Sequence, residues 1–161
     1  MKDVVMAPKD RIGVIKSKDT INRFEKELNI KISTVENMVE IEAEDGLSLY
    51  QGKNIIKAIA RGFAPVKAER LLEEETQLEI LDLGHFTENK LKVIKSRIIG
   101  TEGSMREEIE MGSGTYVSVY GKTVSLIGTY EQIKIAKDAI NLIIDGAMLP
   151  TVKRFLMKSK V

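Results

Sequence analysis

The order of apolar and polar positions along residues 77–147 predicts a series of short strands and helices. Between residues 88 and 99, Leu91, Ile94 and Ile98 recur at spacings of three and four, which is the period of a helix. Other segments are bounded by glycines and rich in β-branched residues, which is typical of strands. The predicted order is a strand at 77–83, a helix at 88–99, a helix from Gly103 to the Gly-Ser-Gly of 112–114, strands at 115–120 and 123–127 joined by Gly121 and Lys122, and a long helix that ends near Gly146.

The first part of the chain repeats this order. A shift of 85 positions places 13–25 on 98–110, 29–35 on 114–120 and 38–43 on 123–128, and 55–62 matches 139–146 at a shift of 84. The pattern therefore predicts two copies of one strand, helix, helix, strand, strand, helix unit. The acidic stretch 70–77 lacks apolar periodicity after Leu72, so we place the boundary there. The predicted domains are 1–73 and 76–147, followed by a basic C-terminal helix at 148–161.

Composition narrows the class of protein. The 161 residues are enough for one ordinary domain or two small ones, and a hydrophobic fraction of 43% with 30% charged residues is typical of a soluble globular protein. Because no apolar run is long enough to cross a bilayer, we expect a cytoplasmic protein. The chain has no cysteine and one histidine, His85, which argues against disulfides and against zinc or redox chemistry. We therefore expect no metal and no cofactor.

Charge is unevenly distributed although the net charge is only +1. Residues 1–82 contain 13 Lys or Arg and 16 Asp or Glu, whereas residues 83–161 contain 12 and 8. A basic second half favours an anionic partner, although solvated surfaces often have a similar balance.

Two glycines three positions apart, Gly100 and Gly103, lie between the two predicted helices of the second copy. Glycine lets a chain turn tightly and lets another molecule approach its backbone. The helix that follows presents unpaired N–H groups and the positive end of its dipole, which together favour a phosphate. The alternative is that Gly100 only ends one helix and Gly103 only permits the turn into the next.

The segment Ile98–Glu110, in this order of elements, resembles the Ile-Ile-Gly-x-x-Gly signature of type I KH domains. The resemblance implies an α+β fold of two tandem KH domains (βααββα each), in which the second domain clamps single-stranded RNA at its glycine loop while bases occupy an apolar groove. Glu102 departs from the family pattern because its carboxylate would repel phosphate. The RNA-binding residues that the resemblance implies are Lys95, Arg97, Ile98, Ile99, Gly100, Thr101, Glu102, Gly103, Ser104, Met105, Arg106 and Lys122. For the apolar members core packing is the alternative, and for the cations it is solvated helix surface.

The corresponding stretch of the first copy, Ile15–Lys18, has no glycine at either signature position, so we expect a degenerate KH domain there. This pairing of a degenerate and an intact KH domain resembles the archaeal form of the partner-of-Nob (dimethylase-interacting) family of pre-rRNA processing factors. The resemblance implies a non-catalytic small-ribosomal-subunit assembly factor that binds near the 3′ end of the small-subunit rRNA. It also implies three protein partners: the endonuclease that matures this end, the rRNA dimethyltransferase and the α subunit of initiation factor two. We expect the chain itself to be a monomer.

Other classes remain open. The main alternative is a KH-fold adaptor for a nuclease or a translation initiation factor, for which RNA binding is secondary; the acidic first half and Glu102 favour it. A KH subunit of an RNA-degrading complex would usually carry an additional barrel domain. An enzyme has little support, because the carboxylate runs are typical of solvated helices and no nucleophile lies beside a base. His85 follows a predicted strand end, and we expect a surface or capping role for it.

Overall fold

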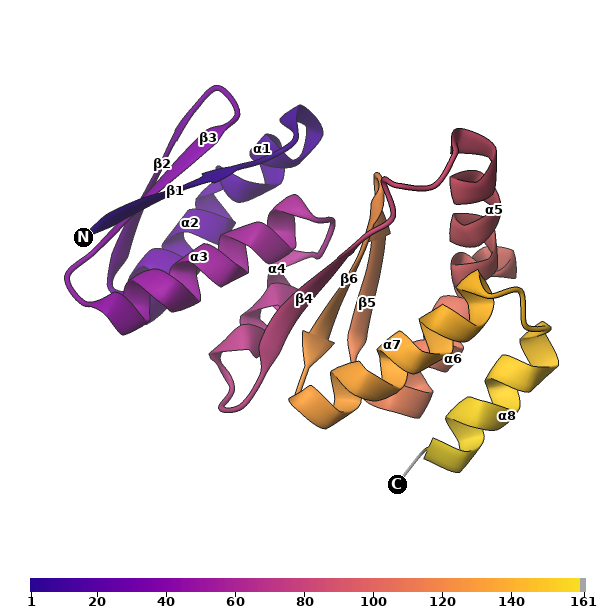
Figure 1. Ribbon diagram of the computed structural model, residues 1–161. Helices are drawn as coiled ribbons and strands as arrows, with labels where there is room; N and C mark the ends of the chain where they lie inside the picture. Colours follow the sequence, from indigo (N-terminus) through magenta and orange to yellow (C-terminus); the bar gives the residue numbers. More distant parts are fainter. Residues whose placement is uncertain (160–161) are drawn as a thin grey trace. The chain divides into compact units, whose positions relative to one another are not determined.

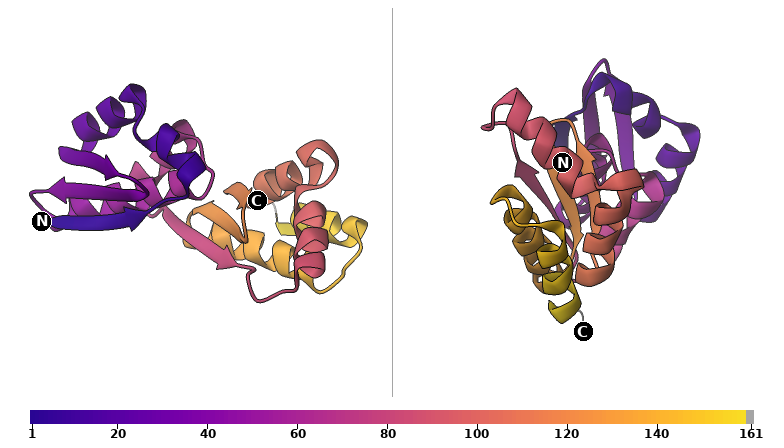
Figure 2. Two further views of the ribbon diagram at one scale, coloured as in Figure 1. Left: turned by 90° about the horizontal axis from the view of Figure 1, so that it is seen from above. Right: turned by 90° about the vertical axis from the view of Figure 1, so that its right-hand side faces the viewer.

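The computed structural model describes residues 1–159, which divide into two compact units, Met1–Glu74 and Glu75 onwards. Each unit is one three-stranded antiparallel sheet with helices packed on one face (Figures 1 and 2). The predicted α+β fold and the predicted order of elements are both confirmed. The last two residues of the predicted C-terminal helix, 160 and 161, lie outside the described part.

The elements of the first unit follow the predicted order. The sequence pattern did not predict the four-residue helix at 65–68 or the 3-10 turn at 69–72, which follow the long helix at 46–60. They are held to the unit by the buried side chains of Ala68 and Leu71. The first unit consists of β1 (Lys2–Met6), α1 (Lys9–Ile15), α2 (Lys18–Leu28), β2 (Ile30–Val35), β3 (Met38–Ala43), α3 (Gly46–Ala60), α4 (Pro65–Ala68) and η1 (Glu69–Leu72).

The second unit follows the same course and adds one helix. Its core includes buried side chains from the three helices that it shares with the first unit, among them Ile98, Ile109 and Ile140, and from an additional helix, α8 (Leu149–Ser159), which contributes Val152 and Leu156. The second unit consists of β4 (Gln77–Asp82), α5 (Glu88–Ile99), η2 (Thr101–Gly103), α6 (Ser104–Ser113), β5 (Tyr116–Tyr120), β6 (Thr123–Gly128), α7 (Tyr130–Ile144) and α8 (Leu149–Ser159).

The two units share individual interactions as well as element order. In the first, the Glu25 carboxylate accepts a hydrogen bond of 2.8 Å from the backbone N–H of Ile32; in the second, Glu110 accepts one of 2.9 Å from Val117. Both pairs are related by the shift of 85 positions seen in the sequence. The same shift relates Asn29 to Gly114, which end α2 and α6 in the left-handed conformation.

An arginine in the first helix of each unit, α1 or α5, contacts the C-terminal end of α3 or α7. Arg11 donates from Nε to the carbonyl of Ile59 and from Nη2 to that of Phe63, both at 2.9 Å. Arg97 donates to the equivalent carbonyls, those of Ile143 at 3.2 Å and of Ala147. These bonds tie the first helix of each unit to the C-terminal end of α3 or α7 and to the residues that follow it.

An ion pair is repeated as well. Lys53 of α3 contacts Asp3 of β1 at 2.8 Å, and Lys137 of α7 contacts Glu79 of β4 at 2.8 Å. Asp3 and Glu79 lie opposite equivalent residues of the central strands, Ile41 and Leu126. Agreement at this level of detail indicates that the two units descend from one duplicated domain.

Candidate nucleic-acid interface

The glycine loop connects α5 to α6 through a single 3-10 turn. Gly100 ends α5 with φ 74° and ψ 178°, and its N–H donates to the carbonyl of Ser96 at 2.8 Å. Glu102 (φ 54°) and Gly103 (φ 81°) then follow in the left-handed region. Two successive left-handed residues turn the chain sharply into α6 and leave Thr101 and Glu102 exposed at the tip.

Gly100 is required by sterics as well as by conformation. A Cβ at this position would lie 2.6 Å from the backbone nitrogen of Met105 and 2.8 Å from its Cβ. Gly103 differs, because a Cβ there would meet only the Arg106 guanidinium, at 3.7 Å. The first glycine therefore brings α5 close to the first turn of α6, and the second provides the backbone conformation.

The N-terminus of α6 is open to a ligand. No side chain in the described part of the chain caps this helix, whose N-cap residue is Gly103. In the first unit the equivalent helix α2 is capped by Ser17, whose hydroxyl accepts from the N–H of Thr20 at 3.3 Å. Unpaired N–H groups at a helix N-terminus favour an anion. The uncapped end of α6 is therefore suited to an anion, whereas in the first unit the Ser17 hydroxyl takes up an N–H of the equivalent helix end.

The predicted cations near the loop have different roles in the structure. Arg97 is bonded to the carbonyls at the end of α7, as described above. Arg106 pairs with Glu110 at 2.9 Å, and Glu110 in turn accepts from Val117. These two arginines therefore stabilise the unit itself. Lys95 and Lys122 lie instead on the surface of a groove beside the loop.

This groove has a volume of about 520 Å³ and lies between α5 and the turn that joins β5 to β6. Ile99 contributes an apolar wall next to the glycine loop. Ile98 and Met105 are buried beneath this surface, 0% and 1% exposed, so they support the groove and do not line it. Ser104 is exposed in the first turn of α6. The lining residues are Glu88, Asn89, Leu91, Lys92, Lys95, Ser96, Ile99, Gly121 and Lys122.

Several lining residues were missed by the sequence analysis. Glu88 and Lys92 were not predicted, although they recur with the predicted Lys95 and Ile99 at spacings of three and four and so share one face of α5. The helix was identified from the neighbouring apolar stripe of Leu91, Ile94 and Ile98, and Leu91 belongs to both the stripe and the groove. The same periodicity, applied to the polar positions, would have identified the face that lines the groove.

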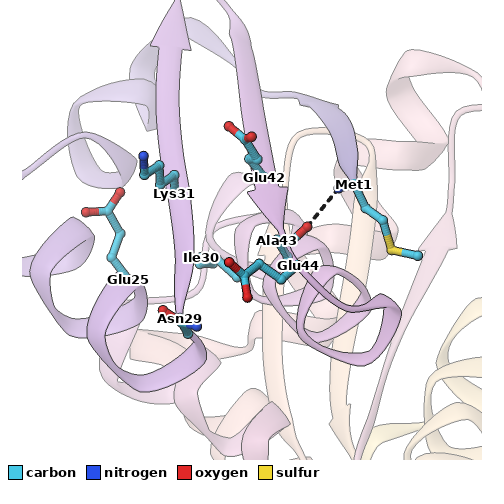
Figure 3. Close-up of a pocket in the computed structure, with 8 residues that line it drawn as sticks. All are labelled: Met1, Glu25, Asn29, Ile30, Lys31, Glu42, Ala43 and Glu44. Atoms are coloured by element: carbon cyan, nitrogen blue, oxygen red, sulfur yellow. Dashed lines mark hydrogen bonds between the residues drawn. The ribbon is translucent and has the colours of Figure 1, made fainter.

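The first unit has a pocket of its own at a different place, the end of its sheet (Figure 3). The pocket has a volume of about 450 Å³ and includes three glutamates: Glu25, Glu42 and Glu44. At its edge the N-terminal ammonium group of Met1 donates to the carbonyl of Ala43 at 2.8 Å. The pocket also contains Lys31, and the shift of 85 positions relates none of its residues to those of the groove, so it is not an equivalent of the groove in the second unit.

Within residues 1–159, no group of three or more His, Cys, Asp or Glu side chains is placed to hold a metal ion. The described helices also include none that is both long enough and apolar enough to span a membrane.

Comparison with known proteins identifies relatives along the whole chain. Residues 77–160 match the family model of the second KH domain of PNO1, a eukaryotic type (type I) KH domain. The KH domain-containing protein MJ0443 of Methanocaldococcus jannaschii is 34% identical over 167 residues, which cover 98% of this chain and 74% of that protein. The crystal structure of Dim2p from Pyrococcus horikoshii OT3 is similar with a TM-score of 0.92 and 40% identity, covering 98% of this chain and 99% of that one.

A second structure from Pyrococcus horikoshii OT3 is a complex of a/eIF2alpha, aDim2p and rRNA. The matched chain is 40% identical to this one, with a TM-score of 0.91, and the match covers 98% of this chain and 93% of that chain.

Proposed function

This chain belongs to the PNO1, or partner-of-Nob, family of type I KH-domain proteins, and on that premise we propose that it is a non-catalytic RNA-binding factor of small-ribosomal-subunit assembly. Its second unit binds about four nucleotides of single-stranded rRNA near the 3′ end. One observation carries this proposal: the N-terminus of α6 has no side-chain cap, and the Gly100–Gly103 loop that leads to it directly follows Ile99, which lines an open groove.

The groove supplies the chemistry that single-stranded RNA requires. The N–H of Ser104 donates to the carbonyl of Thr101, so a backbone phosphate beside the loop accepts hydrogen bonds from the N–H groups that follow it in the first turn of α6. Lys95 and Lys122 provide positive charge along the path of the strand, and Leu91 and Ile99 provide apolar surface for unstacked bases. Glu102, exposed at the tip of the loop, lowers the affinity for phosphate, which would restrict tight binding to RNA that also fills the groove.

The first unit has a different role in this proposal. Its loop is closed by Ser17 and its pocket is acidic, so it favours contacts with protein. The related Dim2p of Pyrococcus horikoshii forms a complex with a/eIF2alpha and rRNA. We extend this to the present chain and propose the same initiation-factor subunit as a partner, together with the endonuclease and the dimethyltransferase that act on the same rRNA region.

The test changes only the exposed tip of the loop. Thr101→Asp places a carboxylate beside the phosphate site without altering either glycine, and Ser33→Asp adds the same group to an exposed strand position of the first unit. Affinity is measured by fluorescence anisotropy with single-stranded RNA of an archaeal small-subunit rRNA 3′ end and with a scrambled RNA. We expect Thr101→Asp to weaken binding at least 10-fold, about 1.4 kcal/mol, and Ser33→Asp to have no effect.

A second variant should strengthen RNA binding instead of weakening it. Glu102→Gln keeps the backbone requirement at φ 54° and removes a negative charge, so we expect tighter RNA binding. Circular dichroism verifies that each variant is folded. Equal RNA affinity of wild type, Thr101→Asp and Glu102→Gln would show that the loop is only a turn, and would favour the adaptor function.

A further inference from the structure

An exposed aromatic pair lies on the loop between β4 and α5, outside the groove. The ring centroids of His85 and Phe86 are 4.1 Å apart and the rings are inclined by 37°. Phe86 is partly buried against the core of the second unit, whereas His85 is exposed to solvent. The imidazole of His85 therefore contacts the Phe86 ring and remains accessible to solvent.

The loop that carries this pair is held in place by its own hydrogen bonds. The N–H of Phe86 donates to the carbonyl of Leu83 at 3.2 Å, and the N–H of Gly84 donates to the Asp82 carboxylate at 2.7 Å. The ammonium group of Lys90 lies 5.2 Å from the centroid of the Phe86 ring, within the range of a cation–π interaction. These bonds fix the backbone of the loop and the Phe86 ring, so binding there costs little further ordering of the backbone, which favours affinity.

The aromatic pair adjoins the groove at the end away from the glycine loop. Leu83 donates its N–H to the carbonyl of Lys122 at 2.7 Å, and Lys122 lines the groove. Glu88 and Asn89, just beyond this loop, also line it. From Glu88 to Ile99 the helix α5 is about 16 Å long, so a strand clamped at the glycines and lying along α5 leaves the groove beside His85.

We propose that His85 is a stacking platform for the first RNA base beyond the groove. The inference rests on the proposed function, and it extends the RNA footprint of the second unit past the nucleotides held between loop and groove. Unpaired bases stack on the faces of His, Phe, Tyr and Trp, and such stacking tolerates any base because every base has a π-face. The platform therefore adds affinity without adding sequence preference.

The test compares RNAs of different length on the full chain. A four-nucleotide RNA fills only the groove, and two longer RNAs extend it by two nucleotides at the 5′ or the 3′ end, with 2-aminopurine as the first added base. We expect one extension to bind more tightly and its 2-aminopurine fluorescence to be quenched. His85→Ala should weaken binding of that RNA roughly 5- to 100-fold and abolish the quenching, with no change for the four-nucleotide RNA.

The matched control is His85→Phe, which keeps a flat aromatic face and should retain both the affinity and the quenching. If His85→Ala binds the extended RNAs as tightly as wild type, the platform is overturned while binding of the four-nucleotide RNA leaves the proposed function intact. Loss with His85→Phe as well as His85→Ala would indicate a hydrogen bond from the imidazole and would overturn stacking. Absence of binding to all three RNAs would overturn the proposed function and this inference together.

Discussion

At the scale of single residues, the two signature glycines have different physical reasons to be glycine. Gly100 has both a left-handed φ and a backbone neighbour that excludes a Cβ, whereas Gly103 has only the left-handed φ. Because Asn and Asp tolerate the left-handed region better than other residues, Gly103 is the more replaceable of the two. A motif that looks symmetrical in the sequence is therefore asymmetrical in the structure.

This asymmetry predicts the effect of Gly100→Ala on stability. The new Cβ would lie 2.6 Å from the backbone nitrogen of Met105, so α5 and α6 must move apart in addition to the conformational strain. We expect the free energy of unfolding to fall by about 2–4 kcal/mol, measured by urea denaturation.

The control for Gly100→Ala is Gly121→Ala. Gly121 has φ 55°, but a Cβ added there would have no atom within 4 Å, so this variant isolates the conformational cost, about 1 kcal/mol. Equal losses in the two variants would mean that the contact with Met105 is relieved without cost.

Arg97 also has a structural role that its position in the sequence motif does not reveal. Arg97 stands next to the glycine signature and was predicted to contact RNA, yet its guanidinium bonds the end of α7 just as Arg11 bonds the end of α3. The repeat was visible in the sequence, but it was aligned at a shift of 85 positions, and these arginines are 86 apart. The RNA-binding role of Arg97 remains a prediction, and its structural role is the better supported.

At the scale of elements, α6 connects three parts of the second unit. Its N-terminus is the proposed phosphate site, the Glu110 carboxylate accepts a hydrogen bond from the backbone of β5, and Gly112 allows α8 to pack closely. A Cβ at Gly112 would lie 2.8 Å from the Cβ of Leu156. The C-terminal helix, predicted as an addition to the KH domain, is therefore part of the core of the second unit.

A double-mutant cycle tests this packing between α6 and α8. Gly112→Ala overpacks the contact and should cost about 1–3 kcal/mol of unfolding free energy. Leu156→Ala leaves a cavity in the core and should cost about 2–5 kcal/mol. In the double variant the contacts of the new methyl group with Cδ2 (3.0 Å) and Cγ (3.3 Å) of Leu156 are removed and only the contact with its Cβ remains, so we expect a total loss smaller than the sum by about 1 kcal/mol. Additive losses in thermal or urea unfolding would show that the two residues do not share a contact.

At the scale of the whole molecule, net charge is a poor guide to function. The chain has a net charge of +1, and both units expose lysines near the loop between their first two helices. The difference lies in what surrounds these lysines, because Ser17 closes the loop of the first unit and the loop of the second is open.

If only the second unit binds RNA, lysine substitutions in the two units should change the salt dependence of RNA affinity differently. Lys95→Gln/Lys122→Gln should weaken RNA binding and reduce the slope of log affinity against log salt by about 1 to 2, since each phosphate contact with single-stranded RNA contributes about 0.7. Lys16→Gln/Lys18→Gln removes the same charge from exposed positions of the first unit and should leave the slope unchanged. Anisotropy titrations at four salt concentrations measure both slopes; the same reduction in both would mean that only overall charge attracts the RNA.

Much of the fold could be predicted because its signals are local. The helix at 88–99 has the predicted bounds, and β3 and β6 are related by the predicted shift of 85 positions. The resemblance to the partner-of-Nob family is confirmed by the family model and by the Pyrococcus Dim2p structures. The short helix α4 was missed because four residues are too few to show a period.

The sequence by itself determined the element order, the duplication and the position of the glycine loop, because hydrophobic period and glycine spacing act between residues close along the chain. Only the tertiary structure decided which helix end stays open, which cations are bonded within the unit, and that His85 lies at the end of the groove. Arg97, for example, bonds carbonyls 46 and 50 positions away. Contacts over such separations depend on how the elements pack, and no local pattern encodes them.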